Sequence, residues 1–116
     1  MRRAMLAVAV AALFLLPVQA AWAVGGSLTA RFNPDTENFH GRVRSSNDEC
    51  SAGRSVKIFL ITSGGRELQG RTHADEAGGW RLHLMDAHGS YVAVASRYEA
   101  MHATCDRLTS DAVDVM

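Results

Sequence analysis

Two histidines with acidic neighbours are the first residues whose types and spacing could do chemistry. His73 and His83 flank a Gly-rich turn, and alternation along the chain puts both on the polar face of the strands beside it. Two imidazoles that face each other across a hairpin can share a Zn²⁺ or Cu²⁺ ion, with Asp75, Glu76 or His88 as further ligands. The pattern predicts a candidate metal site on this face.

The competing interpretation of the two histidines is a solvated sheet face without a ligand. Arg71 and Arg81 share the face, and their positive charges would oppose a bound cation. The sequence has neither a His-x-x-x-His motif nor the Cys/His spacing of a zinc site. We therefore favour the solvated face at the level of sequence, and we expect no cofactor.

Serines, histidines and carboxylates all occur, but no motif arranges them for catalysis. The sequence lacks a Gly-x-Ser-x-Gly nucleophile elbow and a strand–turn–helix pattern that would expose a serine. The Gly-rich segments 63–66 and 78–79 do not lead into a helix, so they lack the aligned amides of a phosphate cradle. A glycosidase carboxylate pair would need a cleft, for which a small domain has little room beside its core. We expect a protein that is not an enzyme.

The first 23 residues predict where the rest of the chain works. Two arginines precede an apolar run from Ala4 to Leu16, and Ala21-Trp22-Ala23 has the small-x-small form that signal peptidases cut. Residues 1–23 are therefore predicted to be a secretory signal peptide, cleaved between Ala23 and Val24, with cleavage after Ala20 as the alternative. Because the apolar run is shorter than the roughly 20 residues that a spanning helix needs, we do not expect a retained membrane anchor. No second apolar stretch of spanning length follows, so we expect no stable membrane insertion after cleavage.

Cys50 and Cys105 are the only cysteines in the chain. Their spacing is not Cys-x-x-Cys, so the pair does not form a recognised metal-binding or redox motif. Two thiols in an oxidising compartment have a single intramolecular pairing, so an exported chain is expected to form a Cys50–Cys105 disulfide. On the chain-entropy model this cross-link would stabilise the fold by about 4 kcal/mol.

Charge and length limit the partners of the exported domain. Removing the two arginines of the leader changes the count from 12 basic and 12 acidic residues to 10 basic and 12 acidic ones. Both signs are spread along the chain, so we expect no basic patch or stripe and no nucleic-acid partner. The excess of arginine over the single Lys57, with frequent alanine and glycine, is typical of a GC-rich bacterial genome.

Strand patterns dominate after the leader, and they must position every residue named above. Short segments alternate between apolar and polar residues and are separated by Gly, Asn and Asp turns. This pattern predicts an all-β, seven-stranded antiparallel β-sandwich, preceded by a signal-peptide helix. Residues 24–37 form its N-terminal segment and first strand, and residues 38–116 form the sandwich domain. The expected strands are Leu28–Phe32, Phe39–Arg44, Val56–Thr62, Leu68–Asp75, Trp80–Leu84, Tyr91–Ser96 and Asp111–Met116.

Three details of this prediction can be checked individually. The run Val56–Thr62 is apolar on both faces apart from one lysine, so we expect it in the interior of a sheet. The turn 75–79 is expected to connect two paired strands of a hairpin. Segment 97–104 is predicted to be a helical turn or a long loop. Alternation places three aromatic residues in the core and not on a sugar-stacking surface: Phe39, Trp80 and Tyr91.

The order of these motifs resembles a known arrangement. Residues 38–116 are similar to the carboxypeptidase regulatory-like, or transthyretin-like (prealbumin-like), group of small seven-stranded Ig-like sandwiches. The residues that carry the resemblance are Phe39-x-Gly41-x-Val43-x-Ser45, Cys50, Arg54-x-Val56-x-Ile58, Asp75-x-x-Gly78-x-Trp80, Gly89-x-Tyr91-x-Ala93 and Cys105. The resemblance implies two antiparallel sheets packed face to face. It implies no activity, and no catalytic residue carries over from it.

Together these observations predict a non-enzymatic exported β-sandwich, a structural or binding module of the bacterial cell envelope or extracellular space. Its partner would be a protein or an extracellular ligand. The alternatives are a small metal- or ligand-binding protein that uses the His73/His83 face, and a secreted hydrolase inhibitor. We expect binding at a sheet edge or at loop tips. The candidate loops are Asn47–Glu49, Ser63–Glu67, Asp86–Ser90 and Tyr98–His102.

Overall fold

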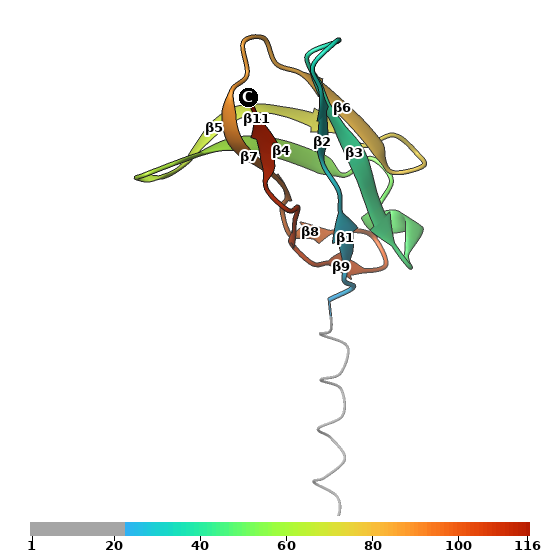
Figure 1. Ribbon diagram of the computed structural model, residues 1–116. Helices are drawn as coiled ribbons and strands as arrows, with labels where there is room; N and C mark the ends of the chain where they lie inside the picture. The colour runs from blue at the N-terminus through green and yellow to red at the C-terminus, as the bar shows by residue number, and fades with distance from the viewer. Residues whose placement is uncertain (1–22) are drawn as a thin grey trace, which may run out of the picture.

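Short strands joined by turns make up residues 23–116, the part of the chain that the computed structural model describes (Figure 1). Within this part there is no α-helix, and all strand pairing between named strands is antiparallel. The predicted signal peptide lies outside the described residues except for Ala23. The elements are β1 (Gly26–Leu28), β2 (Arg31–Asn33), β3 (Asn38–Ser45), the 3₁₀ turn η2 (Asp48–Cys50), β4 (Ser55–Thr62), β5 (Gly65–His73), β6 (Gly79–His83), β7 (Gly89–Ala95), β8 (Tyr98–Glu99), β9 (Thr104–Cys105), β10 (Leu108–Thr109) and β11 (Val113–Val115).

The first sheet is built around β3. Strands β1 and β2 follow one another along one edge of β3, and β6 pairs with its other edge. The expected single strand Leu28–Phe32 is therefore wrong, because the chain breaks between β1 and β2. The break has a local cause: the Thr29 hydroxyl accepts a hydrogen bond from the Arg42 backbone N–H at 3.0 Å, in place of a ladder carbonyl.

The second sheet has the order β10-β7-β4-β5, and β11 also pairs with β7. Strand β4 lies between β7 and β5, so the prediction that Val56–Thr62 is an interior strand is confirmed. Strands β8 and β9 pair with each other, which replaces the helical turn or loop expected for segment 97–104. Cys105 of β9 also forms an isolated parallel bridge with Val24. The structure thus has several antiparallel sheets and more strand segments than the expected seven.

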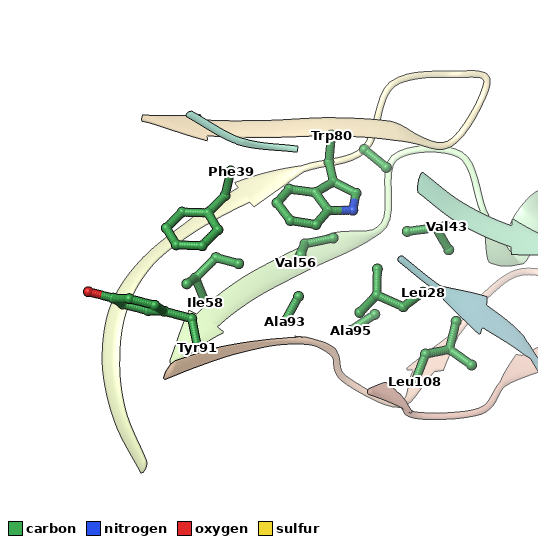
Figure 2. Packing of buried hydrophobic residues seen from close by; sticks show 11 residues of the cluster. Leu28, Phe39, Val43, Val56, Ile58, Trp80, Tyr91, Ala93, Ala95 and Leu108 are labelled. Atoms are coloured by element: carbon green, nitrogen blue, oxygen red, sulfur yellow. The ribbon is translucent and has the colours of Figure 1, made fainter. Parts of the chain in front are cut away.

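The core lies between the two larger sheets, whose apolar side chains point toward each other (Figure 2). Phe39 and Trp80 enter it from the first sheet, and Tyr91 enters it from the second. Their exposed fractions are 0%, 4% and 3%, which confirms the prediction that these aromatic residues are core. The rings of Phe39 and Tyr91 are tilted by 57° with centroids 5.0 Å apart, a favourable arrangement for an aromatic pair.

The predicted hairpin across residues 75–79 is wrong. Strand β5 pairs with β4 and β6 pairs with β3, so the turn carries the chain from one sheet to the other. The turn itself is tight: Asp75 Oδ1 accepts hydrogen bonds from the N–H groups of Ala77 and Gly79, both at 2.9 Å. Gly78 has a φ of +91°, which a glycine adopts without strain. Strand β6 joins β3 because Trp80 then fills the core above Gly41.

The predicted disulfide is confirmed, and it joins η2 to β9. Cys50 and Cys105 are bonded with their Cα atoms 5.3 Å apart, and both are buried. The guanidinium of Arg54, which is 3% exposed, lies beside them and donates to the carbonyl oxygens of Cys50 at 2.8 Å, Ser96 at 3.0 Å and Asp106. The disulfide and this buried cation close the same end of the fold.

Candidate functional site

The outward face of the first sheet gathers basic side chains. Along β3 the inward residues Phe39 and Val43 are buried, whereas the outward residues His40, Arg42 and Arg44 are exposed. This alternation follows from strand geometry, because successive side chains point to opposite faces of a sheet. Three basic side chains therefore project from one strand at every second position.

The neighbouring strands add more basic side chains to the same face. In the ladder, Arg31 of β2 and Arg81 of β6 are the two partners of His40, one on each side of it. Directly opposed residues project on the same face, about 5 Å apart. We call the resulting surface the basic face; its members are Arg31, His40, Arg42, Arg44, Arg81 and His83, and all six are exposed.

Among residues 23–116, no carboxylate forms an ion pair with a side chain of this face. The ion pairs found among residues 23–116 are Arg97–Glu99 and His102–Glu49, and neither involves the basic face. Arg42 Nη1 does donate a hydrogen bond to the backbone oxygen of Ala77, at 3.3 Å, which leaves its positive charge uncompensated. Clustered like charges repel one another and attract anions, so this face has the electrostatics of an anion-binding surface.

A concavity of about 320 Å³ lies in the basic face. Every titratable side chain that lines it is an arginine or a histidine; the lining residues are Thr29, Arg31, His40, Gly41, Arg42 and Arg44. We call it the arginine concavity. The backbone approaches closely at this point, because a Cβ on Gly41 would lie 1.8 Å from the Thr29 carbonyl oxygen. Glycine is therefore required at position 41.

A larger concavity of about 850 Å³ adjoins the first, and both are lined by His40 and Gly41. Its lining includes neutral hydrogen-bonding side chains together with one carboxylate, and we call it the polar concavity. The residues that line it and not the first are Asn33, Thr36, Asn38, Thr72, His73, Asp75, Gly79, Trp80 and Arg81. The first concavity has only basic titratable side chains in its lining, whereas the second combines basic side chains, neutral polar side chains and one carboxylate.

The two histidines of the predicted metal site do not face each other. His73 lies in the second sheet opposite Ser55, whereas His83 lies in the first sheet opposite Asn38. The His83 Nδ1 atom is 3.1 Å from Asn38 Oδ1, and only His73 lines the polar concavity. Residues 23–116 contain no group of three or more His, Cys, Asp or Glu side chains that could hold a metal ion. The expectation of a facing pair is wrong because the turn between them changes sheets.

The other predicted ligands are also dispersed. Asp75 uses one carboxylate oxygen in the turn, where it accepts two backbone hydrogen bonds. Glu76 is exposed in the same turn, and His88 is exposed in the connection between β6 and β7. Neither lines either of the two concavities described above.

Two of the four candidate loops meet in space. Glu49 accepts hydrogen bonds through Oε1 from the His102 backbone N–H at 2.9 Å and through Oε2 from His102 Nδ1 at 2.8 Å. This contact joins the loop Asn47–Glu49 to the loop Tyr98–His102. The hydrogen bond from the His102 side chain, followed by that from its backbone, lowers the pKa of Glu49.

The remaining two candidate loops lie elsewhere. Loop Ser63–Glu67 is at the end of the β4–β5 hairpin, which projects from the body of the molecule (Figure 1). Loop Asp86–Ser90 connects β6 to β7, and the Asp86 N–H donates to Glu37 Oε2 at 3.3 Å. The four loops therefore do not form one shared surface.

The basic face was missed by the sequence analysis, and its premise that the chain has no basic stripe is wrong. One signal was visible: His40, Arg42 and Arg44 alternate with apolar residues in the sequence. The contribution of Arg31 and Arg81 was not visible, because it depends on which strands flank β3. Alternation predicts which residues share a face of one strand, and only the ladder shows which strands share a sheet.

Comparison with known proteins adds no relative to these observations. No family model, no curated protein and no solved structure matches this chain. Over residues 23–116 no helix has the length and apolar character that crossing a bilayer requires. The functional interpretation therefore rests on the geometry of the basic face.

Proposed function

We propose that this protein is a non-enzymatic, exported binding module of the bacterial cell envelope or extracellular space, and that its ligand is an anion bound at the basic face. The single observation that carries this proposal is the collection of four arginines and two histidines on one sheet face without an ion-pair partner among the described residues. The proposal keeps the binding module expected from the sequence and moves its surface from the loops to a sheet.

Arginine chemistry defines the ligand class. A guanidinium group presents a rigid fork of donors that matches the two oxygens of a carboxylate, sulfate or phosphate group. Arg42 and Arg44 project from the central strand of their sheet, which fixes their Cα positions better than a loop would. An anion that bridges several guanidinium groups would relieve the repulsion among them.

Export and fold type are further parts of the proposal. The disulfide between Cys50 and Cys105 is consistent with an oxidising compartment. A cleaved signal peptide would deliver the chain to such a compartment. Cleavage after Ala23 would leave Val24 as the first residue. The Val24 backbone nitrogen donates to the Thr104 carbonyl at 2.7 Å, and a terminal amine would keep this donor. The facing sheets support a β-sandwich of the transthyretin-like type.

Affinity chromatography on an immobilised polyanion tests the proposal. Binding through several arginines should weaken with salt, because released counterions contribute much of the free energy of binding. Replacing Arg42 and Arg44 together with glutamine should lower the affinity about tenfold or more. The matched control replaces Arg66 and Arg71, two exposed arginines of β5, and removes the same charge from the other sheet. Equal loss in both double variants would contradict the proposal.

A further inference from the structure

The two concavities adjoin at β3, and we call them together the binding path. Both are lined by His40 and Gly41, so a ligand that occupies the arginine concavity can extend directly into the polar one. The residues that line the two concavities come from β2, β3 and β6 and from the end of β5. This geometry suits a chain-like ligand better than an isolated small anion.

The two halves of the path differ in chemistry. In the arginine concavity, Arg31, Arg42 and Arg44 present positive charge and leave no lining carboxylate to compete with a ligand anion. In the polar concavity, Asn38 and Thr72 supply neutral donors and acceptors beside the Asp75 carboxylate. Arg81 also lines it and supplies one guanidinium, so this concavity has a mixed lining where the first has a purely basic one. An uncharged hydroxyl can donate to that carboxylate, whereas an anionic group would be repelled by it. The ligand should therefore carry anionic groups and free hydroxyls along one chain.

Base stacking has little surface here, because Trp80, the aromatic residue that lines the polar concavity, is only 4% exposed. The aromatic residues of the first sheet, Phe32, Phe39 and Trp80, pack in or against the core, and Figure 2 shows Phe39 and Trp80 pointing toward the opposite sheet. Single-stranded nucleic acids depend on aromatic side chains for much of their affinity. A polyphosphate lacks hydroxyls for the polar concavity, and a densely sulfated glycan has few left. A polymer with one carboxylate per sugar supplies both groups.

Resting on the function proposed above, we infer that the ligand is a carboxylated polysaccharide, a polyuronate. Its carboxylates would lie against the arginines of the arginine concavity, and its hydroxyls would hydrogen-bond in the polar concavity. Bidentate contact between a guanidinium and a carboxylate accounts for the first half. Side-chain amide, hydroxyl and carboxylate groups account for the second. The β3 residues His40 and Gly41 lie where the two halves meet.

Calorimetric titration of the exported protein with oligogalacturonate tests this inference. Neutral dextran, inorganic polyphosphate and single-stranded DNA serve as comparison ligands. A variant with Asn38→Ala and Thr72→Val should bind oligogalacturonate about tenfold more weakly, because two hydrogen-bonding groups are lost. Polyphosphate should bind more weakly than oligogalacturonate and should be insensitive to this variant. Thr109→Val, on an exposed position of β10, is the matched control and should bind like the natural protein.

The outcomes separate this inference from the proposed function. Polyphosphate or DNA binding as tight as oligogalacturonate binding, with no effect of the polar-concavity variant, would overturn the polyuronate and leave anion binding intact. Absence of binding to every anionic polymer would overturn both. The near-ultraviolet circular dichroism of each variant must match that of the natural protein. If the double variant fails this check, Thr72→Val alone is used, and it should weaken oligogalacturonate binding about threefold to fivefold.

Discussion

Replacing the buried Arg54 with methionine perturbs the contact that joins three separate segments of the fold. The guanidinium donates to the carbonyl oxygens of Cys50 in η2, Ser96 after β7 and Asp106 after β9. Only 3% of the residue is exposed, and its bond to the Cys50 carbonyl is buried, so water cannot easily take over that bond. Its Nε atom is buried and has no hydrogen-bond partner among the described residues. Methionine would keep the apolar stem and remove the donors.

The magnitude follows from these contacts. A hydrogen bond from a charged group contributes about 1.5–3 kcal/mol, and Arg54 makes three. Desolvation opposes this gain: burial lowers the pKa of the Arg54 guanidinium, while the charge of Asp106 acts in the opposite direction. Water can still reach the two partly buried carbonyls in the variant. We therefore expect Arg54→Met to reduce the free energy of unfolding by about 3–5 kcal/mol.

Urea denaturation, followed by Trp80 fluorescence, measures this loss directly. Arg97→Met is the matched control, because the Arg97 side chain is 57% exposed and its contact with Glu99 is a long surface pair of 3.9 Å. The control should change the free energy of unfolding by less than about 0.5 kcal/mol. A loss below about 1 kcal/mol for Arg54→Met, or equal losses in both variants, would refute the reasoning.

Three further predictions concern the disulfide, the Glu49 carboxylate and Gly41 of β3. Replacing Cys50 and Cys105 with serine should lower the free energy of unfolding by about 4 kcal/mol in urea denaturation, because the unfolded chain regains the entropy of a long loop. The pKa of Glu49 is lowered by the His102 hydrogen bonds, so its stabilising contribution is present above the ordinary value of 4.5 and is lost as pH falls through the folded value. Stability measured against pH should therefore decline less below 4.5 in Glu49→Gln. Gly41→Ala should destabilise the protein by about 2 kcal/mol or more, because its Cβ would meet a backbone oxygen at 1.8 Å.

Each of these predictions has a control and an outcome that would contradict it. The reduced natural protein should match the double serine variant; equal stability of oxidised and reduced protein would contradict the chain-entropy argument. An unchanged pH profile in Glu49→Gln would show that the hydrogen bonds to His102 do not contribute in solution. Gly64→Ala is the control for position 41, because a Cβ there meets no atom within 4 Å. Similar effects at both glycines would contradict the close backbone approach.

The sequence predicted individual strands better than their partners. Alternation correctly placed Phe39 and Trp80 in the core, and the apolar run of β4 correctly predicted an interior strand. The turn at Asp75 was also recognised by its residue types. The hairpin predicted from this turn was wrong, since β6 pairs with β3 instead of β5. Turn chemistry fixes the local reversal of the chain, whereas the pairing depends on which sheet edge accepts the next strand.

The candidate site was predictable only in part for the same reason. The outward positions of His40, Arg42 and Arg44 follow from the sequence pattern alone. The addition of Arg31 and Arg81 requires the register of β2 and β6 against β3. The net charge of the chain does not reveal such a face, because acidic residues elsewhere on the molecule cancel its positive charges in the sum. The same separation of sheets removes the predicted contact between the two histidines.

Mapping amide chemical shifts by NMR during titration with oligogalacturonate tests most directly whether the basic face binds an anion. The account predicts that the largest shifts fall on β2, β3 and β6, at residues 31, 40–44 and 81. Residues 59, 61 and 68 of the second sheet, which serve as an internal reference, should hardly shift. Shifts confined to the loops Asn47–Glu49 and Tyr98–His102, or centred on the second sheet, would contradict the account.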